Sequence, residues 1–331
     1  MQLGCIGAGS WGTTLAVYLA RLGRNVRLLP HSRDQFERLE SDRENRRYLP
    51  GIEFPPSIEV SDSIDEVLAS DLVIIATPTQ HIRSTLLQAT SAPSSDSFFV
   101  NTSKGIERGT LLRVSEVIAD VLPVESERIV TLSGPSHAEE VSRADPAALV
   151  AGSLDMERAT LTQEIFSSDS LRVYTTDDII GVELGGALKN IIALCAGIID
   201  GLKFGDNTKA ALLTRGLAEI TRLGVALGAR HETFSGLSGL GDLIVTCWSS
   251  HSRNRYVGEQ IGRGRTLGDV VAEMSMVAEG VATTESAREL AMRAGVEMPI
   301  INQVHQILFG NKDPRAAIDE LMTRTTKQEV W

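Results

Sequence analysis

Short apolar runs alternate with helical patterns along the first half of the chain. Runs typical of buried strands lie at residues 2–6, 25–29, 57–60, 71–77, 98–101, 128–132, 147–151 and 171–174. Helical patterns lie at residues 10–22, 34–41, 63–69, 79–89 and 110–121, after residue 137, and near residues 156–167. Such alternation is typical of an α/β fold whose doubly wound parallel sheet carries helices on both faces. We therefore predict a Rossmann-like sheet domain.

The pattern changes near residue 176, and the rest of the chain is mostly helical. Helical patterns occupy residues 179–202, 210–227, 267–274, 283–294, 300–308 and 314–322. The chain has 331 residues, which is more than one hydrophobic core usually supports. We predict a sheet domain at residues 1–176 and an all-α domain at residues 177–331.

The helix predicted at residues 179–202 is the most apolar in the chain. It contains Glu183, Lys189, Asn190 and Asp200, which a membrane span tolerates poorly. We therefore predict a buried core helix and no integral membrane segment. The chain starts with a strand pattern instead of a basic region and a signal core, so export is not expected.

Charge and cysteine usage narrow the range of functions. The net charge of −11 argues against nucleic acid as a partner, because nucleic-acid-binding proteins usually carry a basic field. It also means that an anionic ligand needs a local basic pocket. The three cysteines form no CxxC pair, which favours reduced thiols and a cytoplasmic protein. The six histidines are scattered singly, and no metal site is predicted.

The first predicted strand ends in a glycine turn, Gly7-x-Gly9-x-x-Gly12. Gly7 permits a sharp turn out of the strand, Gly9 permits close approach of a pyrophosphate, and Gly12 permits close packing of the next helix. The N-terminus of that helix attracts phosphate groups. The position between a strand and a helix favours a dinucleotide-binding turn over an ordinary glycine turn.

The end of the second predicted strand bears on the choice of cofactor. NAD enzymes usually carry an acid there for the adenosine ribose. This chain has Pro30-His31-Ser32-Arg33 and no acid before Asp34. A cation and a hydroxyl suit a 2′-phosphate, so NADP(H) is favoured and NAD(H) stays possible. The alternative is that Arg33 is a solvated loop residue.

Two lysines are candidates for proton transfer. Lys104 follows the strand at residues 98–101, at the edge of the sheet where ligands bind; the alternative is an exposed loop lysine. Lys189 precedes Asn190 inside the apolar helix. A desolvated lysine has a lowered pKa, which suits proton exchange with an alcohol or ketone. The alternative is a lysine that extends to the surface.

Two further motifs lie in the second half. Asp242 follows a glycine-rich stretch, so its carboxylate could cap a helix or fix a lysine. Ser252-Arg253-Asn254 could bind a phosphate, because a guanidinium group matches that anion with two hydrogen bonds. The alternative is a solvated basic loop.

Together these motifs resemble the NAD(P)-dependent glycerol-3-phosphate dehydrogenases. The resemblance depends on Gly7-x-Gly9-x-Trp11-Gly12-Thr13, Lys104-Gly105, Gly134-Pro135-Ser136, Leu188-Lys189-Asn190, Gly236-Leu237-x-Gly239-x-Gly241-Asp242 and Ser252-Arg253-Asn254. It extends from residue 3 to about residue 310. It implies a Rossmann-like N-terminal domain and an α-helical substrate domain, in agreement with the pattern above.

The resemblance also implies roles for the residues at matching positions. Lys189 would be the proton donor and acceptor, with Lys104 and Asp242 as its catalytic partners. Substrate-binding residues would be Lys104, Gly134, Ser136, Asn190, Thr246, Ser252, Arg253 and Asn254. Cofactor-binding residues would be Gly7, Gly9, Ser10, Trp11, Gly12, His31, Ser32, Arg33, Lys104, Ala138, Arg253, Val277 and Glu279. Residues 30–33 depart from the family pattern, in which a Trp and a small residue often precede the His or Arg.

The implied activity is the reversible reduction of dihydroxyacetone phosphate to sn-glycerol 3-phosphate, which supplies glycerophospholipid synthesis. The resemblance suggests a cytoplasmic homodimer. Two alternatives stay open. A related hydroxyacid or 6-phosphogluconate-type dehydrogenase also pairs Lys with Asn on a helix. A nucleotide-sensing protein could keep the fold without turnover, although the combination of Lys104, Lys189 and Asp242 argues against it.

Overall fold

Eight strands form one sheet in the order β3-β2-β1-β4-β5-β6-β7-β8. The computed structural model describes residues 1–326, 328 and 329. Its strands are β1 (Gln2–Ile6), β2 (Asn25–Leu29), β3 (Ile58–Val60), β4 (Leu72–Ile75), β5 (Phe98–Asn101), β6 (Ile129–Ser133), β7 (Ala147–Ser153) and β8 (Leu171–Thr176). The reversal of strand order at β1 and β4 is the Rossmann arrangement. The predicted α/β, Rossmann-like fold class is confirmed.

The prediction of an all-parallel sheet is wrong at one strand pair. β6 and β7 are antiparallel, with Val130 opposite Ser153, while the other neighbouring strands are parallel. Between them lies α6 (Ala138–Ser142), which has only five residues. A parallel crossover needs a longer connection to return the chain to the opposite edge of the sheet. The chain therefore turns back and runs antiparallel as β7.

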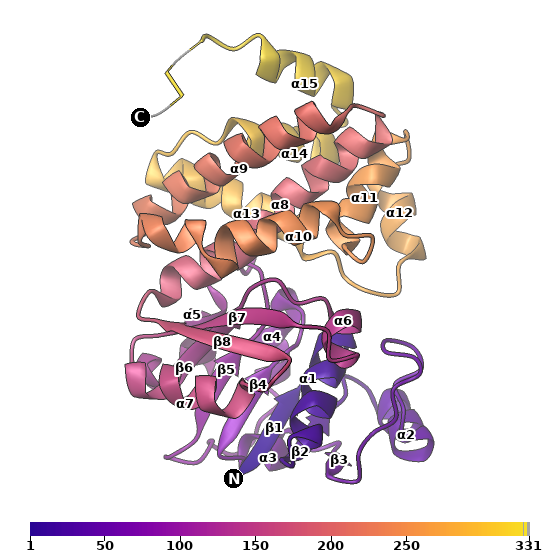
Figure 1. The fold of residues 1–331 in the computed structure, drawn as a ribbon, viewed down its shortest axis with the longest axis vertical. Helices are drawn as coiled ribbons and strands as arrows, with labels where there is room; N and C mark the ends of the chain where they lie inside the picture. The colour runs from indigo at the N-terminus through magenta and orange to yellow at the C-terminus, as the bar shows by residue number, and fades with distance from the viewer. Residues whose placement is uncertain (327, 330–331) are drawn as a thin grey trace.

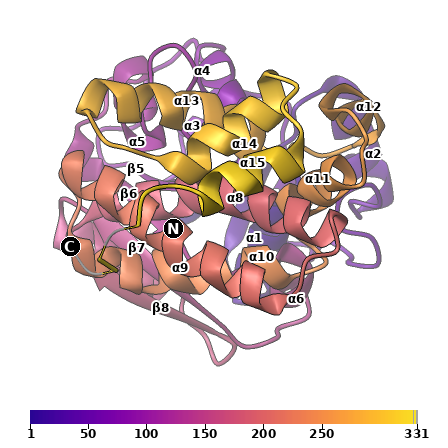
Figure 2. The same cartoon turned by 90° about the horizontal axis from the view of Figure 1, so that it is seen from above.

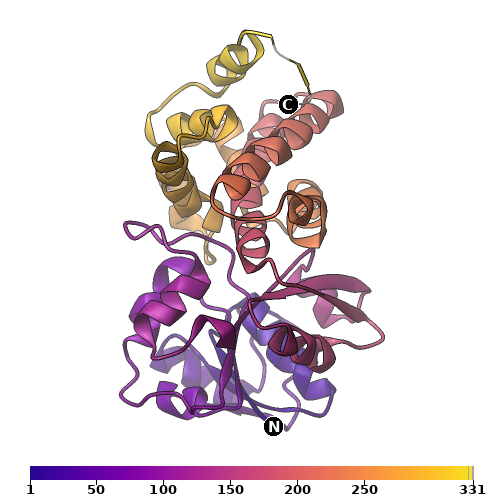
Figure 3. The same ribbon diagram turned by 90° about the vertical axis from the view of Figure 1, so that its left-hand side faces the viewer.

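Alternating side chains of the strands fill two separate cores, one on each face of the sheet. In β4, Leu72 and Ile74 belong to one core, whereas Val73 and Ile75 belong to the other. The first face is covered by α1 (Ser10–Arg21), α2 (Arg33–Asp42), α6 and α7 (Met156–Phe166). The second is covered by α3 (Ile64–Leu68), α4 (Thr79–Leu86) and α5 (Val114–Val121). Figure 3 shows these two helical layers edge-on.

The helical half lies on one side of the sheet domain (Figure 1). It contains α8 (Ile179–Gly201), α9 (Asp206–Ala226), α10 (Asp242–Trp248), α11 (Arg253–Gly262), α12 (Leu267–Glu273), α13 (Glu279–Ala294), α14 (Pro299–Phe309) and α15 (Pro314–Met322). Seen from above, the other helices lie around α8 (Figure 2). β8 ends at Thr176 and α8 begins at Ile179; we propose the domain boundary between them. Residues 327, 330 and 331 of the predicted second domain lie outside the described residues.

α8 is the core helix of the second domain. Its length and composition alone would allow it to cross a membrane, and it is the one such helix in the described part of the chain. However, 94% of its most apolar window is buried in the protein, as expected for a core helix. Its side chains contact those of α9, α13 and α14 in the third hydrophobic core.

Two helices, α10 and α11, were not predicted. α11 contains Gly258 and Gly262, and glycine is usually unfavourable within a helix, but here the glycines permit a backbone-to-backbone crossing with α8. A Cβ atom added at Gly258 would lie 1.9 Å from the carbonyl oxygen of Leu194, and one at Gly197 would lie 1.9 Å from that of Arg255. This crossing brings the N-terminal turn of α11 beside the middle of α8, where Lys189 lies.

Candidate active site

Residues from both domains line one elongated cleft with two sections. The first section lies between the sheet domain and the helical domain, and the second extends over the carboxyl ends of β1 and β2. Predicted site residues that line the cleft are Gly7, Gly9, Ser10, Trp11, His31, Lys104, Ser136, Ala138, Lys189, Asn190, Asp242, Thr246, Ser252, Arg253, Asn254, Val277 and Glu279. Gly12, Ser32, Arg33 and Gly134 do not line it. The folding thus brings most of the predicted residues together.

The glycine turn has the geometry that a dinucleotide requires. Gly7 has φ of +109°, and a Cβ atom on Gly12 would lie 1.9 Å from the carbonyl oxygen of Gly7. A Cβ atom on Gly9 would instead meet nothing within 4 Å, so the backbone is open to the cleft. Ser10, the first residue of α1, has a buried hydroxyl without a partner among the described residues. The turn therefore fits a pyrophosphate at the N-terminus of α1.

The residues predicted at the adenosine end have other partners in the structure. Ser32 caps α2 by accepting a hydrogen bond from the backbone N–H of Gln35, at 3.2 Å. The Nδ1 atom of His31 lies 2.5 Å from Oε1 of Gln35, and the His31 ring lines the cleft. Arg33 is paired with Glu37, at 2.9 Å, and with Asp62. Arg33 is therefore not a free cation.

Part of the wall of this section was not predicted from the sequence. Tyr48 also lines the section, as do His81, Ser84, Thr85 and Gln88 of α4 and its C-terminal end. Residues 81, 84, 85 and 88 follow the spacing of one helix face. That spacing could have identified the wall once the helix at residues 79–89 was placed beside the glycine turn.

The first section contains a cluster of three charges, in which Lys189 and Asp242 are buried and Lys104 is half-buried. Asp242 accepts a hydrogen bond from Nζ of Lys189 through Oδ1, at 2.9 Å, and from Nζ of Lys104 through Oδ2, at 2.6 Å. Lys189 also donates to Oγ1 of Thr246, at 2.6 Å, and Lys104 donates to the carbonyl oxygen of Gly134, at 2.9 Å. Lys189 is only 5% exposed, so it does not extend to the surface. Two roles were predicted for the Asp242 carboxylate, capping a helix or fixing a lysine. These hydrogen bonds show the second, because the carboxylate holds both lysines.

This arrangement lowers the pKa of Lys189 toward neutral pH. Burial, opposed by the Asp242 carboxylate and assisted by the positive charge of Lys104, lowers the pKa of Lys189 to about 8. Burial acts to raise the pKa of Asp242, but the two ammonium groups outweigh burial and hold that pKa below its usual value. A lysine with a pKa near the working pH can both donate and accept a proton.

Two asparagines connect this cluster to α11. Asn190 donates from Nδ2 to the carbonyl oxygen of Lys104, at 3.1 Å, and accepts from Nδ2 of Asn254, at 2.9 Å. Asn254 in turn accepts from the backbone N–H of Gly280, at 2.9 Å. Both amides are buried. These hydrogen bonds fix the positions of the Lys104 loop, α8, α11 and the start of α13 relative to one another.

Arg253 precedes Asn254 in α11 and lies at the cleft. It lines both sections of the cleft and has no hydrogen-bond or ion-pair partner among the described residues. Nearby, Oε1 of Glu279 accepts from the backbone N–H of Thr79, at 2.8 Å, whereas Oε2 is buried without a partner in the described chain. Burial raises the pKa of Glu279. Both side chains thus have unused polar capacity toward a ligand.

Two histidines that were not predicted as site residues, His137 and His251, also line the first section. Their ring centroids are 5.7 Å apart. Burial, and then the positive charge of Lys189, lower the pKa of His137. Their single occurrence along the chain gave no sign of this pairing.

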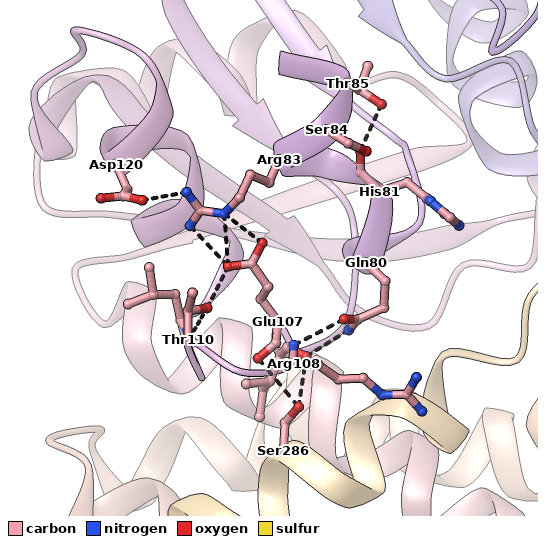
Figure 4. A network of polar contacts seen from close by, with 12 residues as sticks. Gln80, His81, Arg83, Ser84, Thr85, Glu107, Arg108, Thr110, Asp120 and Ser286 are labelled. Atoms are coloured by element: carbon pink, nitrogen blue, oxygen red, sulfur yellow. Dashed lines mark hydrogen bonds and ion pairs between the residues drawn. The ribbon is translucent and has the colours of Figure 1, made fainter. Parts of the chain in front are cut away.

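A polar network between α4, α13 and residues 106–110 holds part of the loop between β5 and α5 (Figure 4). Lys104 lies on the same loop. Glu107, which is buried, accepts from Nε of Arg83 at 2.9 Å and from Nη2 of Arg83 at 3.0 Å. The carbonyl oxygen of Ile106 accepts from Gln80 of α4, at 2.9 Å, and from Ser286 of α13, at 3.2 Å. The loop is therefore tied to both domains.

Two models of one protein family together match most of the chain. The family model described as the N-terminus of NAD-dependent glycerol-3-phosphate dehydrogenase matches residues 2–159, and the model described as its C-terminus matches residues 178–319. The chain belongs to the NAD-dependent glycerol-3-phosphate dehydrogenase family. The resemblance inferred from the motifs is confirmed.

Individual members of the family match this chain over nearly its whole length. Glycerol-3-phosphate dehydrogenase [NAD(P)+] of Chlorobium phaeobacteroides is 52% identical over 333 residues, which cover 100% of both chains. The second such protein of Salinibacter ruber is 49% identical and covers 98% of this chain and 95% of its own. The crystal structure of glycerol-3-phosphate dehydrogenase from Coxiella burnetii has a TM-score of 0.93 at 36% identity, with 98% and 99% of the two chains covered.

A D-mandelate dehydrogenase structure shares the fold alone, with a TM-score of 0.64 at 15% identity.

Within residues 1–326, 328 and 329 of this family member, no group of three or more His, Cys, Asp or Glu side chains could hold a metal ion.

Proposed function

We propose that the chain catalyses the reversible reduction of dihydroxyacetone phosphate to sn-glycerol 3-phosphate with a nicotinamide dinucleotide. The observation that carries this proposal is the Lys189–Asp242–Lys104 cluster, which shares one cleft with the glycine turn and the unpaired Arg253. A lysine with a lowered pKa can donate a proton to a carbonyl oxygen, and an unpaired guanidinium group can bind a phosphate. Full-length relatives named glycerol-3-phosphate dehydrogenase [NAD(P)+] support the same reaction.

In the proposed mechanism, Arg253 binds the substrate phosphate, assisted by Ser252 and Asn254. When bound, the nicotinamide cofactor supplies the hydride for the ketone carbon. Lys189 donates a proton to the carbonyl oxygen as negative charge develops there, and Lys104 adds a second positive group. Asp242 holds the two ammonium groups apart and in place, because each contacts a different oxygen of its carboxylate.

Gly9, Ser10 and Trp11 at the turn would hold the pyrophosphate of the cofactor. Ala138, Val277 and Glu279, which line the same section of the cleft, would contribute to binding its nicotinamide end. NADP(H) is preferred over NAD(H), because no acid follows β2 before Asp34, and Asp34 is paired with Arg38 at 2.6 Å. We further propose a cytoplasmic homodimer that supplies glycerophospholipid synthesis, on the basis of the family resemblance.

A direct assay tests this function against the main alternative. The purified chain should oxidise NADPH and NADH, followed by absorbance, with dihydroxyacetone phosphate as substrate. It should show far lower kcat/KM with 2-oxoacids, which carry no phosphate for Arg253. It should also show far lower kcat/KM with 6-phosphogluconate, which is assayed in the oxidative direction with NADP+ against glycerol 3-phosphate as the reference substrate. Preference for a hydroxyacid or oxoacid pair would favour a related dehydrogenase. Cofactor binding without turnover on any of these substrates would favour a nucleotide sensor.

A further inference from the structure

Arg33 is held in a pair of carboxylates at the outer edge of the sheet. Its Nε donates to Oε1 of Glu37 at 2.9 Å, and its Nη1 pairs with Asp62. Its guanidinium group lies 4.9 Å from the ring centroid of Phe36. The side chain is 66% exposed, so these ion pairs are in contact with solvent and can exchange for another anion.

The two carboxylates hold the guanidinium group on the side of β2 that faces away from the glycine turn. Asp62 follows β3, which is the strand beyond β2 at the edge of the sheet, whereas the glycine turn follows β1 on the other side of β2. Glu37 is one turn further along α2. In agreement with this placement, His31 lines the cleft and Arg33 does not. Arg33 with its two partners carries a net negative charge, which repels a phosphate.

We propose that Glu37 and Asp62 determine cofactor specificity by competing with the 2′-phosphate of NADP(H) for Arg33. This inference rests on the proposed function, because it concerns the cofactor of that reaction. NAD(H) has no 2′-phosphate and is insensitive to the state of Arg33. The two carboxylates therefore lower the preference for NADP(H) that an unpaired arginine would give, and keep both cofactors usable.

The expected effect is modest, because exposed ion pairs are weak. Replacing either carboxylate by its amide removes one competitor of the 2′-phosphate and one repelling charge. Each of Glu37→Gln and Asp62→Asn should raise the ratio of kcat/KM for NADPH to that for NADH by about two- to fivefold. The double variant should exceed both single variants without being their product, because both partners share one guanidinium group.

The experiment measures kcat/KM for both cofactors at saturating dihydroxyacetone phosphate. The variants are Glu37→Gln, Asp62→Asn, their double variant, and each carboxylate variant combined with Arg33→Ala. Asp34→Asn is the matched control, because Asp34 lies on the same helix and pairs with Arg38 instead of Arg33. It removes one negative charge, as each single carboxylate variant does, without releasing Arg33.

In the carboxylate variants, we predict a higher ratio of kcat/KM for NADPH to kcat/KM for NADH, because the value for NADPH rises and the value for NADH does not change. The ratio should not rise when Arg33 is replaced by Ala. An unchanged ratio in the double variant would overturn the inference, as would an equal rise with Asp34→Asn or a rise that persists with Arg33→Ala. If the unmodified chain does not reduce dihydroxyacetone phosphate with either cofactor, the proposed function fails instead. The two failures are therefore distinguishable.

Discussion

Replacing Asp242 by Asn removes the carboxylate that both Lys104 and Lys189 contact. An opposite charge within about 4–6 Å shifts a pKa by about 1–3 units, and Nζ of Lys189 is 2.9 Å from Oδ1 of Asp242. The pKa of Lys189, about 8 in the intact site, should therefore fall to about 5–7. At about pH 7.5 the protonated fraction would drop from roughly three-quarters to between roughly 0.3% and 24%. Protonation alone then predicts a roughly 3- to 250-fold loss of ketone reduction.

The assay is the pH profile of kcat in both directions. Ketone reduction requires the ammonium form, so its kcat should fall as pH rises through the pKa of Lys189. Alcohol oxidation requires the neutral amine, so its kcat should rise through the same pKa. In Asp242→Asn both midpoints should move to lower pH by about 1–3 units. At neutral pH, reduction should therefore suffer more than oxidation, which a general loss of folded enzyme would not produce.

Asp200→Asn is the matched control for this variant. Asp200 is also a carboxylate between two cations, Lys209 and Arg255, with the Arg255 contact at 2.7 Å, but it does not line the cleft. It should leave both midpoints in place. If Asp242→Asn folds and keeps the midpoint of the unmodified chain, the reasoning about Lys189 is refuted.

Three further predictions follow from other parts of the structure. Arg253→Ala should raise KM for dihydroxyacetone phosphate by about 10- to 100-fold with a smaller change in kcat, because a hydrogen bond to a charged group contributes about 1.5–3 kcal/mol; an unchanged KM in steady-state kinetics would exclude Arg253 as the phosphate ligand. Gly258→Ala should lower the free energy of unfolding in urea by about 1–3 kcal/mol, because its methyl group would overlap the carbonyl oxygen of Leu194. Gly268→Ala, whose nearest atom would be 3.9 Å away, is its control, and equal behaviour of the two would contradict the close crossing. Burial raises the pKa of Glu219 to about 7, although two backbone N–H groups of α14 donate hydrogen bonds to its carboxylate. Because the pKa is higher in the folded state, the folded chain binds more protons than the unfolded chain. The free energy of unfolding should therefore fall as pH rises from about 4.5 to 7, by up to about 3 kcal/mol. The stability difference between Glu219→Gln and the unmodified chain should therefore change between pH 5 and 7.5 in urea unfolding, and a constant difference would contradict the raised pKa.

Local patterns were sufficient to predict the parts of the molecule that depend on near neighbours. The spacing of Gly7, Gly9 and Gly12 predicted the turn, because each glycine is needed within one strand–turn–helix unit. Lys189 was identifiable since a lysine among apolar neighbours in a core helix requires a partner. The sequence also suggested that Asp242 could be that partner, as the 2.9 Å contact confirms.

Features set by distant segments could not be predicted in this way. Arg33 meets Asp62 from 29 residues away, and the sequence contains no local sign that the cation is neutralised. Asn190 and Asn254 are 64 residues apart and meet because α8 and α11 cross at their glycines. The sequence around Arg253 and Asn254 is polar and equally typical of a solvated basic loop, which is why α11 was missed. The antiparallel β7 likewise depends on the length of a connection instead of the strand's own pattern.

The most direct test of the account is turnover of Lys189→Met, an apolar side chain of similar length. The measurement pairs the kcat of dihydroxyacetone phosphate reduction with the dissociation constant of NADPH from fluorescence titration. We predict a loss of kcat of about 100- to 10,000-fold, as expected for removal of a general acid, with an unchanged dissociation constant. Turnover close to that of the unmodified chain would contradict the central role of Lys189.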